Sequence, residues 1–121
     1  MQSNTTMVLG ASPNPERYSY MATVMLLEKG HAIYPYGIKK GMIQSLSIEQ
    51  EWPIPGSINT LTLYLGPTAQ AEYYDQMIAL KPERIIFNPG TENPRLVELA
   101  HAANISTIEA CTLVMLTTGQ Y

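Results

Sequence analysis

The sequence has little that would tie it to an oxidising compartment, a membrane or a nucleic acid. Its single cysteine, Cys111, excludes an intrachain disulfide and with it the usual support of a small secreted scaffold. Seven lysines and arginines stand against ten acidic residues, so a net charge of −3 provides no basic surface for nucleic acid. No apolar run approaches the roughly 20 residues of a membrane helix, and the polar N-terminus lacks a signal-peptide pattern. We therefore expect a cytoplasmic protein that binds neither membranes nor nucleic acids.

Catalytic side chains are also scarce. The chain has two histidines, one aspartate and one cysteine, which are widely spaced and form no metal-binding pattern. Paired carboxylates, a G-x-S-x-G elbow and a Walker lysine are missing. The G-x-G-x-x-G dinucleotide fingerprint is absent as well, because only Gly10 is present after the first apolar run. After the second run no acidic residue occurs until Glu49, which argues against a site for NAD. These absences favour a domain that binds a ligand without catalysis.

What the sequence does contain is a regular alternation of predicted strands and helices. Apolar and β-branched runs predict strands at residues 7–10, 31–36, 60–65, 84–87 and 106–110. Helical patterns predict helices over residues 17–29 and 69–80, and a third from Asn93-Pro94 to about residue 103. Gly30 and Asn104 are placed to end the first and the last of them. Residues 38–57 are expected to be irregular with one short strand, and residues 113–116 to form a helical turn.

This alternation predicts a single Rossmann-like α/β domain over residues 1–121, a length typical of one domain. We expect an open parallel sheet of about five strands with helices on both faces. Right-handed crossovers leave few topologies, and among them we favour the strand order 3-2-1-4-5. Ligands of such sheets bind beyond the carboxyl ends of the strands, at the point where the strand order reverses. In the predicted order this point lies between the first and the fourth strand.

The loop after the first strand is the leading candidate for phosphate binding. Gly10 allows a close approach to the backbone, and Ser12 and Asn14 carry short polar side chains. The helix that follows presents free N–H groups and the positive end of its dipole. The alternative is that a β–α turn uses these residue types only for its backbone. Tyr18 and Tyr20 open this helix and are candidates for closing the pocket, with core packing as the alternative for Tyr20.

Three further loops are expected at the same edge of the sheet. Lys39 and Lys40 follow the second strand and can neutralise phosphates, unless they are simply solvated surface lysines. The pair Gly66-Pro67 offers a flat wall for a base or for pantetheine, or a simple turn. In the loop Asn88-Pro89-Gly90 the asparagine side chain can donate and accept hydrogen bonds, either to a ligand or within the loop itself.

With these residues in place, the chain resembles the stand-alone CoA-binding domain family, which is similar to the nucleotide-binding domain of the succinyl-CoA synthetase alpha subunit. The resemblance spans roughly residues 5–116. It rests on Gly10-Ala11-Ser12-Pro13-Asn14-Pro15, Tyr34-Pro35, Tyr64-Leu65-Gly66-Pro67, Asn88-Pro89-Gly90 and Cys111, in that order. The chain departs from many relatives at Pro35-Tyr36-Gly37-Ile38, where they have Pro-x-Asn-Pro.

The resemblance implies that coenzyme A or an acyl-CoA is the ligand. It also implies that Gly66-Pro67 borders the adenine end and that the loop after Pro35, with Tyr36 and Gly37, meets the phosphates or the adenosine. Neither histidine matches the phosphohistidine of the synthetase, so no enzymatic activity is implied. The residues expected at the pyrophosphate are Gly10, Ala11, Ser12 and Asn14.

The sequence is compatible with three functions. The leading one is a binding module for coenzyme A or an acyl-CoA, a small nucleotide ligand, without catalysis. The second is a small oxidoreductase that uses NADP, with Lys39 or Lys40 on the 2′-phosphate. The third is an interaction protein that keeps the nucleotide fold without its ligand. Cys111 follows the fifth strand and is a candidate for a mixed disulfide with the CoA thiol, and the alternative is a buried packing residue.

Overall fold

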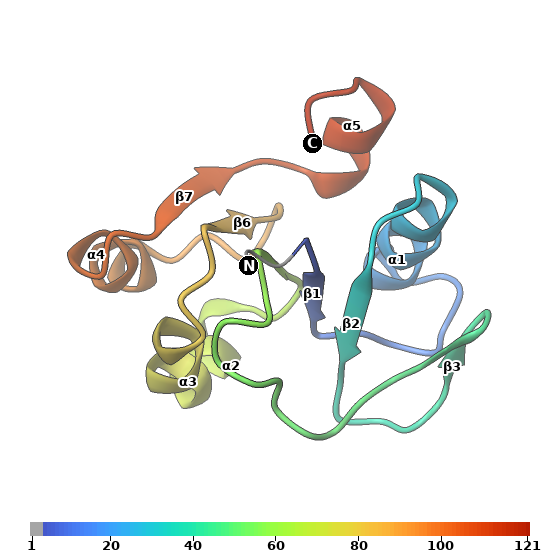
Figure 1. Ribbon diagram of the computed structural model, residues 1–121, viewed down its shortest axis with the longest axis horizontal. Helices are drawn as coiled ribbons and strands as arrows, with labels where there is room; N and C mark the ends of the chain where they lie inside the picture. Colours follow the sequence, from blue (N-terminus) through green and yellow to red (C-terminus); the bar gives the residue numbers. More distant parts are fainter. Residues whose placement is uncertain (1–3) are drawn as a thin grey trace.

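The sheet is built on two buried central strands. In the computed structural model, which describes residues 4–121, β1 (Thr6–Leu9) pairs in parallel with β5 (Thr60–Leu63), and every residue of both strands is buried. The sheet has five parallel strands in the order β2-β1-β5-β6-β7 (Figure 1). The remaining strands are β2 (Ile33–Tyr36), β6 (Arg84–Phe87) and β7 (Ser106–Glu109). The predicted Rossmann-like α/β class is confirmed, while residues 1–3 of the polar N-terminus lie outside the described residues.

The predicted strand order is wrong. Counted along the chain, the order is 2-1-3-4-5 instead of 3-2-1-4-5, because β5, the third strand of the parallel sheet, lies between β1 and β6. β2 contains Pro35, which has no N–H to donate to a neighbouring strand and therefore suits the edge of a sheet. β5 is buried on both faces, as a central strand must be. The strand order consequently reverses between β1 and β5, and not between the first and the fourth strand.

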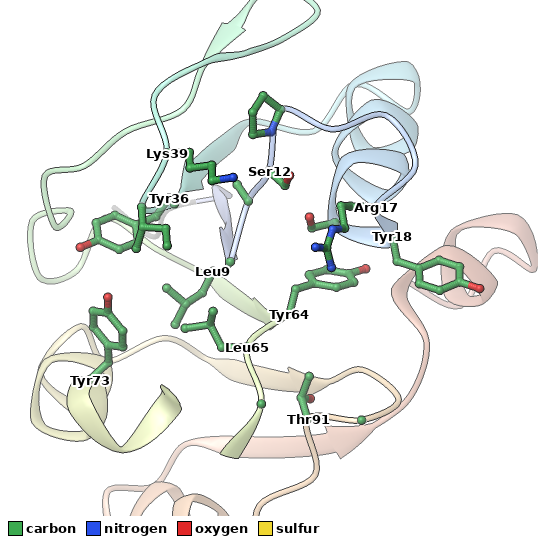
Figure 2. A pocket seen from close by; sticks show the side chains of 18 of the residues that line it. Leu9, Ser12, Arg17, Tyr18, Tyr36, Lys39, Tyr64, Leu65, Tyr73 and Thr91 are labelled. Atoms are coloured by element: carbon green, nitrogen blue, oxygen red, sulfur yellow. The ribbon is translucent and has the colours of Figure 1, made fainter. Parts of the chain in front are cut away.

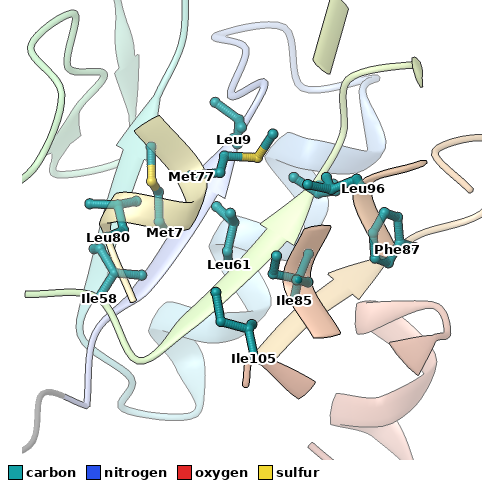
Figure 3. Close-up of a cluster of buried hydrophobic side chains, with 12 residues drawn as sticks. Met7, Leu9, Ile58, Leu61, Met77, Leu80, Ile85, Phe87, Leu96 and Ile105 are labelled. Carbon is teal, nitrogen blue, oxygen red and sulfur yellow. The ribbon is translucent and has the colours of Figure 1, made fainter. Parts of the chain in front are cut away.

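Helices cover both faces of the sheet, as predicted. They are α1 (Tyr18–Glu28) and α5 (Thr112–Thr117) on one face, and α3 (Tyr74–Ala79) and α4 (Pro94–Ala102) on the other. Val8 of β1 belongs to the same buried cluster as Leu26 of α1. Its neighbour Met7 belongs to the larger cluster on the other face, together with Met77 and Leu96 (Figure 3). None of the helices among the described residues is long and apolar enough to cross a membrane.

Two of the predicted helices differ in their regularity. The one predicted over residues 17–29 is α1, and Gly30 follows it with a φ of +82° that suits its role as a helix stop. The one predicted over residues 69–80 is divided into α2 (Pro67–Gln70), the 3-10 turn η1 (Ala71–Tyr73) and α3. The Gln70 side chain is buried, and its Nε2 donates to the carbonyl oxygens of Leu65 and Thr91 at 2.8 Å each. This side chain fixes the first turn to the loops after β5 and β6.

The segment between β2 and β5 has more structure than the sequence predicts. Where one short strand is expected, it forms a small hairpin of β3 (Met42–Ile43) and β4 (Leu46–Ser47). After the hairpin, the backbone of Glu49 pairs with the outer edge of β2. Its N–H donates to the Pro35 carbonyl oxygen at 2.8 Å, and its own carbonyl oxygen accepts from the Gly37 N–H at 3.1 Å. The outer edge of β2 is therefore covered by the chain itself.

Asn93 fixes the N-terminus of α4, as predicted. Its Oδ1 accepts from the N–H groups of Arg95 and Leu96 at 3.1 and 3.3 Å. Its Nδ2 donates to Gln70 Oε1 at 2.9 Å and to the Tyr74 hydroxyl at 2.8 Å. One buried side chain thus caps α4 and also ties this helix to α2 and α3.

We predict that Asn93→Ala lowers the free energy of unfolding by about 1–3 kcal/mol, because it removes a helix cap and leaves buried partners without a donor. Urea denaturation measures the change. Arg95→Ala is the matched control, since it alters the same helix turn at a surface ion pair with Glu98, and it should cost less than about 1 kcal/mol. Equal losses for the two variants would contradict the role assigned to Asn93.

Candidate functional site

A cavity of about 420 Å³ opens at the carboxyl ends of β1, β2 and β5 (Figure 2). This is the edge at which ligands of parallel α/β sheets bind, and the cavity lies where the strand order reverses. Its volume falls within the range of roughly 300–1,000 Å³ that is usual for small-molecule sites. It is lined by residues 9–13, 17–19, 36–39, 64–66, 73 and 89–91.

The turn after β1 forms the floor of the cavity and is held on both sides. The N–H groups of Gly10 and Ala11 both donate to the Tyr36 carbonyl oxygen, at 3.0 and 2.9 Å. On the other side Gly10 lies against Tyr64. Its φ is +100°, and a Cβ atom at position 10 would lie only 3.0 Å from the Tyr64 carbonyl carbon, which is too close. Glycine is therefore required at position 10 for the approach of β1 to β5, whatever the ligand.

Gly37 completes this packing from the side of β2. A Cβ atom at position 37 would lie 2.3 Å from the Ala11 carbonyl oxygen, which is shorter than any real contact of this kind. The turn itself is stabilised by its own side chains, because Ser12 Oγ accepts from the Asn14 N–H and Asn14 Oδ1 accepts from the Glu16 N–H. Asn14 is exposed and does not line the cavity, so its structural duty lies in the turn.

The N-terminus of α1 faces the cavity without a cap. Its N-cap residue Arg17 makes no side-chain capping bond, and the first turn contains no acidic residue. The partial positive charge of the helix end is therefore not offset by a capping side chain or by an acidic residue of the first turn. Arg17 and Lys39 both line the cavity, and the lining residues of the described chain include no aspartate or glutamate. In a protein with a net charge of −3, this cavity collects positive charge and favours an anionic ligand.

Aromatic rings form the opposite wall. Tyr36 and Tyr73 line the cavity, and Trp52 stacks on Tyr73 with ring centroids 5.4 Å apart and planes 9° from parallel. Tyr36 meets the Trp52 ring edge-on at 5.1 Å. Burial, followed by the neighbouring Tyr73 hydroxyl, raises the pKa of Tyr36 above its usual value of 10.0, and burial raises the pKa of Tyr64 as well. Both phenols stay uncharged at neutral pH, so neither repels an anion.

The structure brings most of the predicted site residues together. Those that line the cavity are Gly10, Ala11, Ser12, Tyr36, Gly37, Lys39, Gly66, Pro89 and Gly90. Those that do not line it are Asn14, Pro35, Lys40, Pro67, Asn88 and Cys111. Tyr18 belongs to the lining, whereas Tyr20 packs against the core between α1 and α5. Contact between a ligand and the residues of the second group stays a prediction, including the mixed disulfide of Cys111 with a thiol.

Asn88 has a structural duty that the sequence does not reveal. Its side chain is buried, and Nδ2 donates to Thr62 Oγ1 at 2.7 Å and to the Leu63 carbonyl oxygen at 2.8 Å. Its Oδ1 accepts from the N–H of Thr112 at 2.8 Å. These bonds join β5, the end of β6 and the start of α5. The hydrogen-bonding capacity that suggested a ligand is used within the protein.

Several cavity residues escaped the sequence analysis. Arg17 lies seven positions after Gly10, directly before α1. An arginine so close to a turn that is predicted to bind phosphate could have been recognised from the sequence as a candidate site residue. Tyr64 and Leu65 also belong to the lining; they are part of a motif that carries the family resemblance but are not among the predicted site residues. Tyr73 reaches the cavity from the 3-10 turn η1, inside what the sequence predicts as one regular helix, and no local pattern indicates this.

The strand order, the tight turn after β1 and the open end of α1 define a Rossmann-like α/β domain with a ligand pocket. The chain belongs to the CoA-binding domain family. The model of this family, described as "CoA binding domain", matches residues 4–117. The search against curated proteins gave no match.

The chain is similar to several solved structures. One, described as an uncharacterized protein, is 42% identical with a TM-score of 0.93, and each chain covers 100% of the other. A hypothetical protein from Pyrococcus horikoshii OT3 is 25% identical with a TM-score of 0.84, over 97% of this chain and 83% of that chain. The structure of cell-free ID.343 from Thermus thermophilus is 18% identical with a TM-score of 0.83, over 98% and 91%, which supports the fold alone.

We predict that Gly37→Ala destabilises the protein by about 1–3 kcal/mol, the usual cost of forcing an extra carbon into packed atoms. Thermal or urea unfolding measures this. Gly66→Ala is the control at a second glycine of the cavity, because a Cβ atom there meets nothing within 4 Å. Alanine is a poorer N-cap residue than glycine, which lowers the stability, but it also makes the unfolded chain stiffer, which raises it. Each effect is worth about 0.5–1 kcal/mol, so Gly66→Ala should change the stability little. A stable Gly37→Ala variant would show that the two loops are not packed as described.

Proposed function

We propose that the cavity binds coenzyme A or an acyl-CoA and that the domain acts as a binding module without catalysis. The observation that carries the proposal is that Arg17, Lys39 and the uncapped N-terminus of α1 all border the cavity, with no acidic residue among the lining residues of the described chain. Membership of the CoA-binding domain family supports the choice of ligand. A cytoplasmic location, predicted from the sequence, agrees with such a ligand.

We propose that the phosphate groups of the ligand lie beside these cations. A guanidinium offers two parallel N–H donors to a phosphate, and the Arg17 side chain is exposed. The only ion pair within 4.0 Å among the described residues joins Arg95 and Glu98, so neither Arg17 nor Lys39 is committed to a carboxylate. The N–H groups of the first turn of α1 complete the site, as at other helix ends that bind phosphate.

The less polar parts of the ligand are placed along the rest of the cavity. Tyr36 and Tyr73 form its aromatic wall, and Leu65 and Ile38 add aliphatic surface. Such a wall suits a nucleotide base or the pantetheine arm of coenzyme A. Gly66 also lines the cavity, in keeping with the border that the resemblance assigns to Gly66-Pro67.

The absence of catalysis is proposed from the chemistry of the lining. No histidine, cysteine, aspartate or glutamate occurs among the lining residues of the described chain. These are the side chains that most often act as general acids, general bases or nucleophiles. The lining instead offers cations, phenols and backbone groups, which suit recognition of a ligand.

We predict that coenzyme A raises the melting temperature more than NAD, NADP or ATP does. A ligand at 100 times its Kd stabilises the folded state by about 2.7 kcal/mol, which a thermal shift assay detects easily. A larger shift with NADP would favour the oxidoreductase, and no shift with any of the four would favour the interaction protein.

Two variants locate the phosphate site. Arg17→Ala and Lys39→Ala should each weaken binding of coenzyme A by about 1.5–3 kcal/mol and reduce its dependence on salt, because each removes a cation that faces the phosphates. Isothermal titration measures both effects. Lys40→Ala is the matched control, since this lysine neighbours Lys39 and does not line the cavity. Equal losses for Lys39→Ala and Lys40→Ala would show that the phosphates lie elsewhere.

A further inference from the structure

One edge of the sheet is covered by the chain, and the other is open. At β2 the edge contains Pro35 and is covered by Glu49, which exchanges backbone hydrogen bonds with Pro35 and Gly37. At the opposite end of the sheet β7 pairs only with β6, and no other strand of the described residues lies beyond it (Figure 1). The protection of this edge is limited to the short length of the strand and the charge of Glu109, because Ser106-Thr107-Ile108-Glu109 contains no proline and no lysine.

The backbone of β7 presents free hydrogen-bonding groups to the outside. The N–H groups of Ser106 and Ala110 point inward, since they donate to the carbonyl oxygens of Glu83 and Phe87 at 3.1 Å each. Alternate residues of a strand point to opposite sides along the direction of hydrogen bonding. The N–H and C=O groups of Thr107 and Glu109 therefore point away from the sheet.

From this edge we infer that two copies of the chain form a dimer by pairing their β7 strands in antiparallel fashion about a two-fold axis at Ile108. In this register Thr107 faces the partner's Glu109, and Glu109 faces the partner's Thr107. Each pair exchanges two N–H to C=O bonds, so all the outward groups of both residues are satisfied. The sheets of the two copies become one continuous sheet.

The side chains of β7 complement themselves in the same register. Ile108, a large apolar side chain that is 42% exposed, lies on the axis and packs against the partner's Ile108. Thr107 and Glu109 point to the opposite face, where Thr107 Oγ1 is 3.0 Å from Nε2 of His101 on α4. The partner's Glu109 stands opposite Thr107 and thus on the face of the sheet that carries His101, whose imidazole can take part in hydrogen bonds.

Two further features of the surface bear on this dimer: a hollow beside β7 and the covered edge at β2. A hollow lined by His101, Asn104, Ile105, Ser106 and Thr107 lies next to the edge and can receive the partner's Glu109. Because the edge at β2 is covered, strand pairing cannot continue from copy to copy, and the assembly closes as a two-fold dimer. Four-residue strands bury little surface, so the dimer is weak and depends on concentration.

Sedimentation velocity over a wide range of concentrations tests the dimer. The wild-type protein should shift from monomer to dimer as its concentration rises. Ile108→Lys, which places two like charges on the axis, and Thr107→Pro, which removes one outward N–H, should both stay monomeric. Ile54→Lys is the matched control, since Ile54 is 76% exposed and remote from β7 in the sequence, and it should dimerise like the wild type.

Amide hydrogen exchange in the wild-type protein tests the register without any variant. The amides of Thr107 and Glu109 should exchange more slowly at high concentration, while those of Ser106 and Ala110, already bonded inward, should be protected at every concentration. The inference is overturned if the protein stays monomeric throughout, or if its dimer survives Ile108→Lys and Thr107→Pro. It is also overturned if exchange at Thr107 and Glu109 does not change with concentration.

Discussion

The exit of β1 is clamped between the exits of its two neighbouring strands, and the rest of the site is arranged around this clamp. On one side the carbonyl oxygen of Tyr36 accepts hydrogen bonds from two successive N–H groups of the turn. On the other side the Tyr64 N–H donates to the Leu9 carbonyl oxygen at 2.8 Å. These contacts leave no room for side-chain carbon at Gly10 or Gly37. The turn is thereby fixed, and it aims the start of α1 at the ends of β2 and β5.

Much of the fold is encoded locally and is predictable for that reason. The apolar runs locate all the strands of the parallel sheet, and the Asn93-Pro94 pair locates the start of α4. The strand order is a different kind of information, because it depends on where the long segment between β2 and β5 leads the chain. Pro35 in β2 was a local hint of an edge strand that outweighs the preference for a familiar order.

Some residues of the candidate site are likewise predictable from the local sequence, and others are not. Residues that follow a strand directly, such as Gly10, Lys39 and Gly66, are found from the general rule for parallel sheets. Asn88 follows a strand too, but its polar groups bond to β5 and α5 within the protein, and a sequence cannot show which partner a polar side chain has chosen. Tyr73 reaches the cavity from the 3-10 turn η1, which directly follows Gln70 and its buried hydrogen bonds, and a sequence pattern does not show where such a helix is interrupted.

The clamp at the exit of β1 also shapes how the family can change over evolutionary time. Gly10 and Gly37 serve the scaffold, so we expect substitutions there to impair folding before they alter any ligand preference. Arg17, Ile38 and Lys39 are exposed and have no such duty among the contacts of the described residues. New ligand specificities are therefore expected to arise by drift at these rim positions, while the floor of the cavity keeps its glycines through every change of ligand.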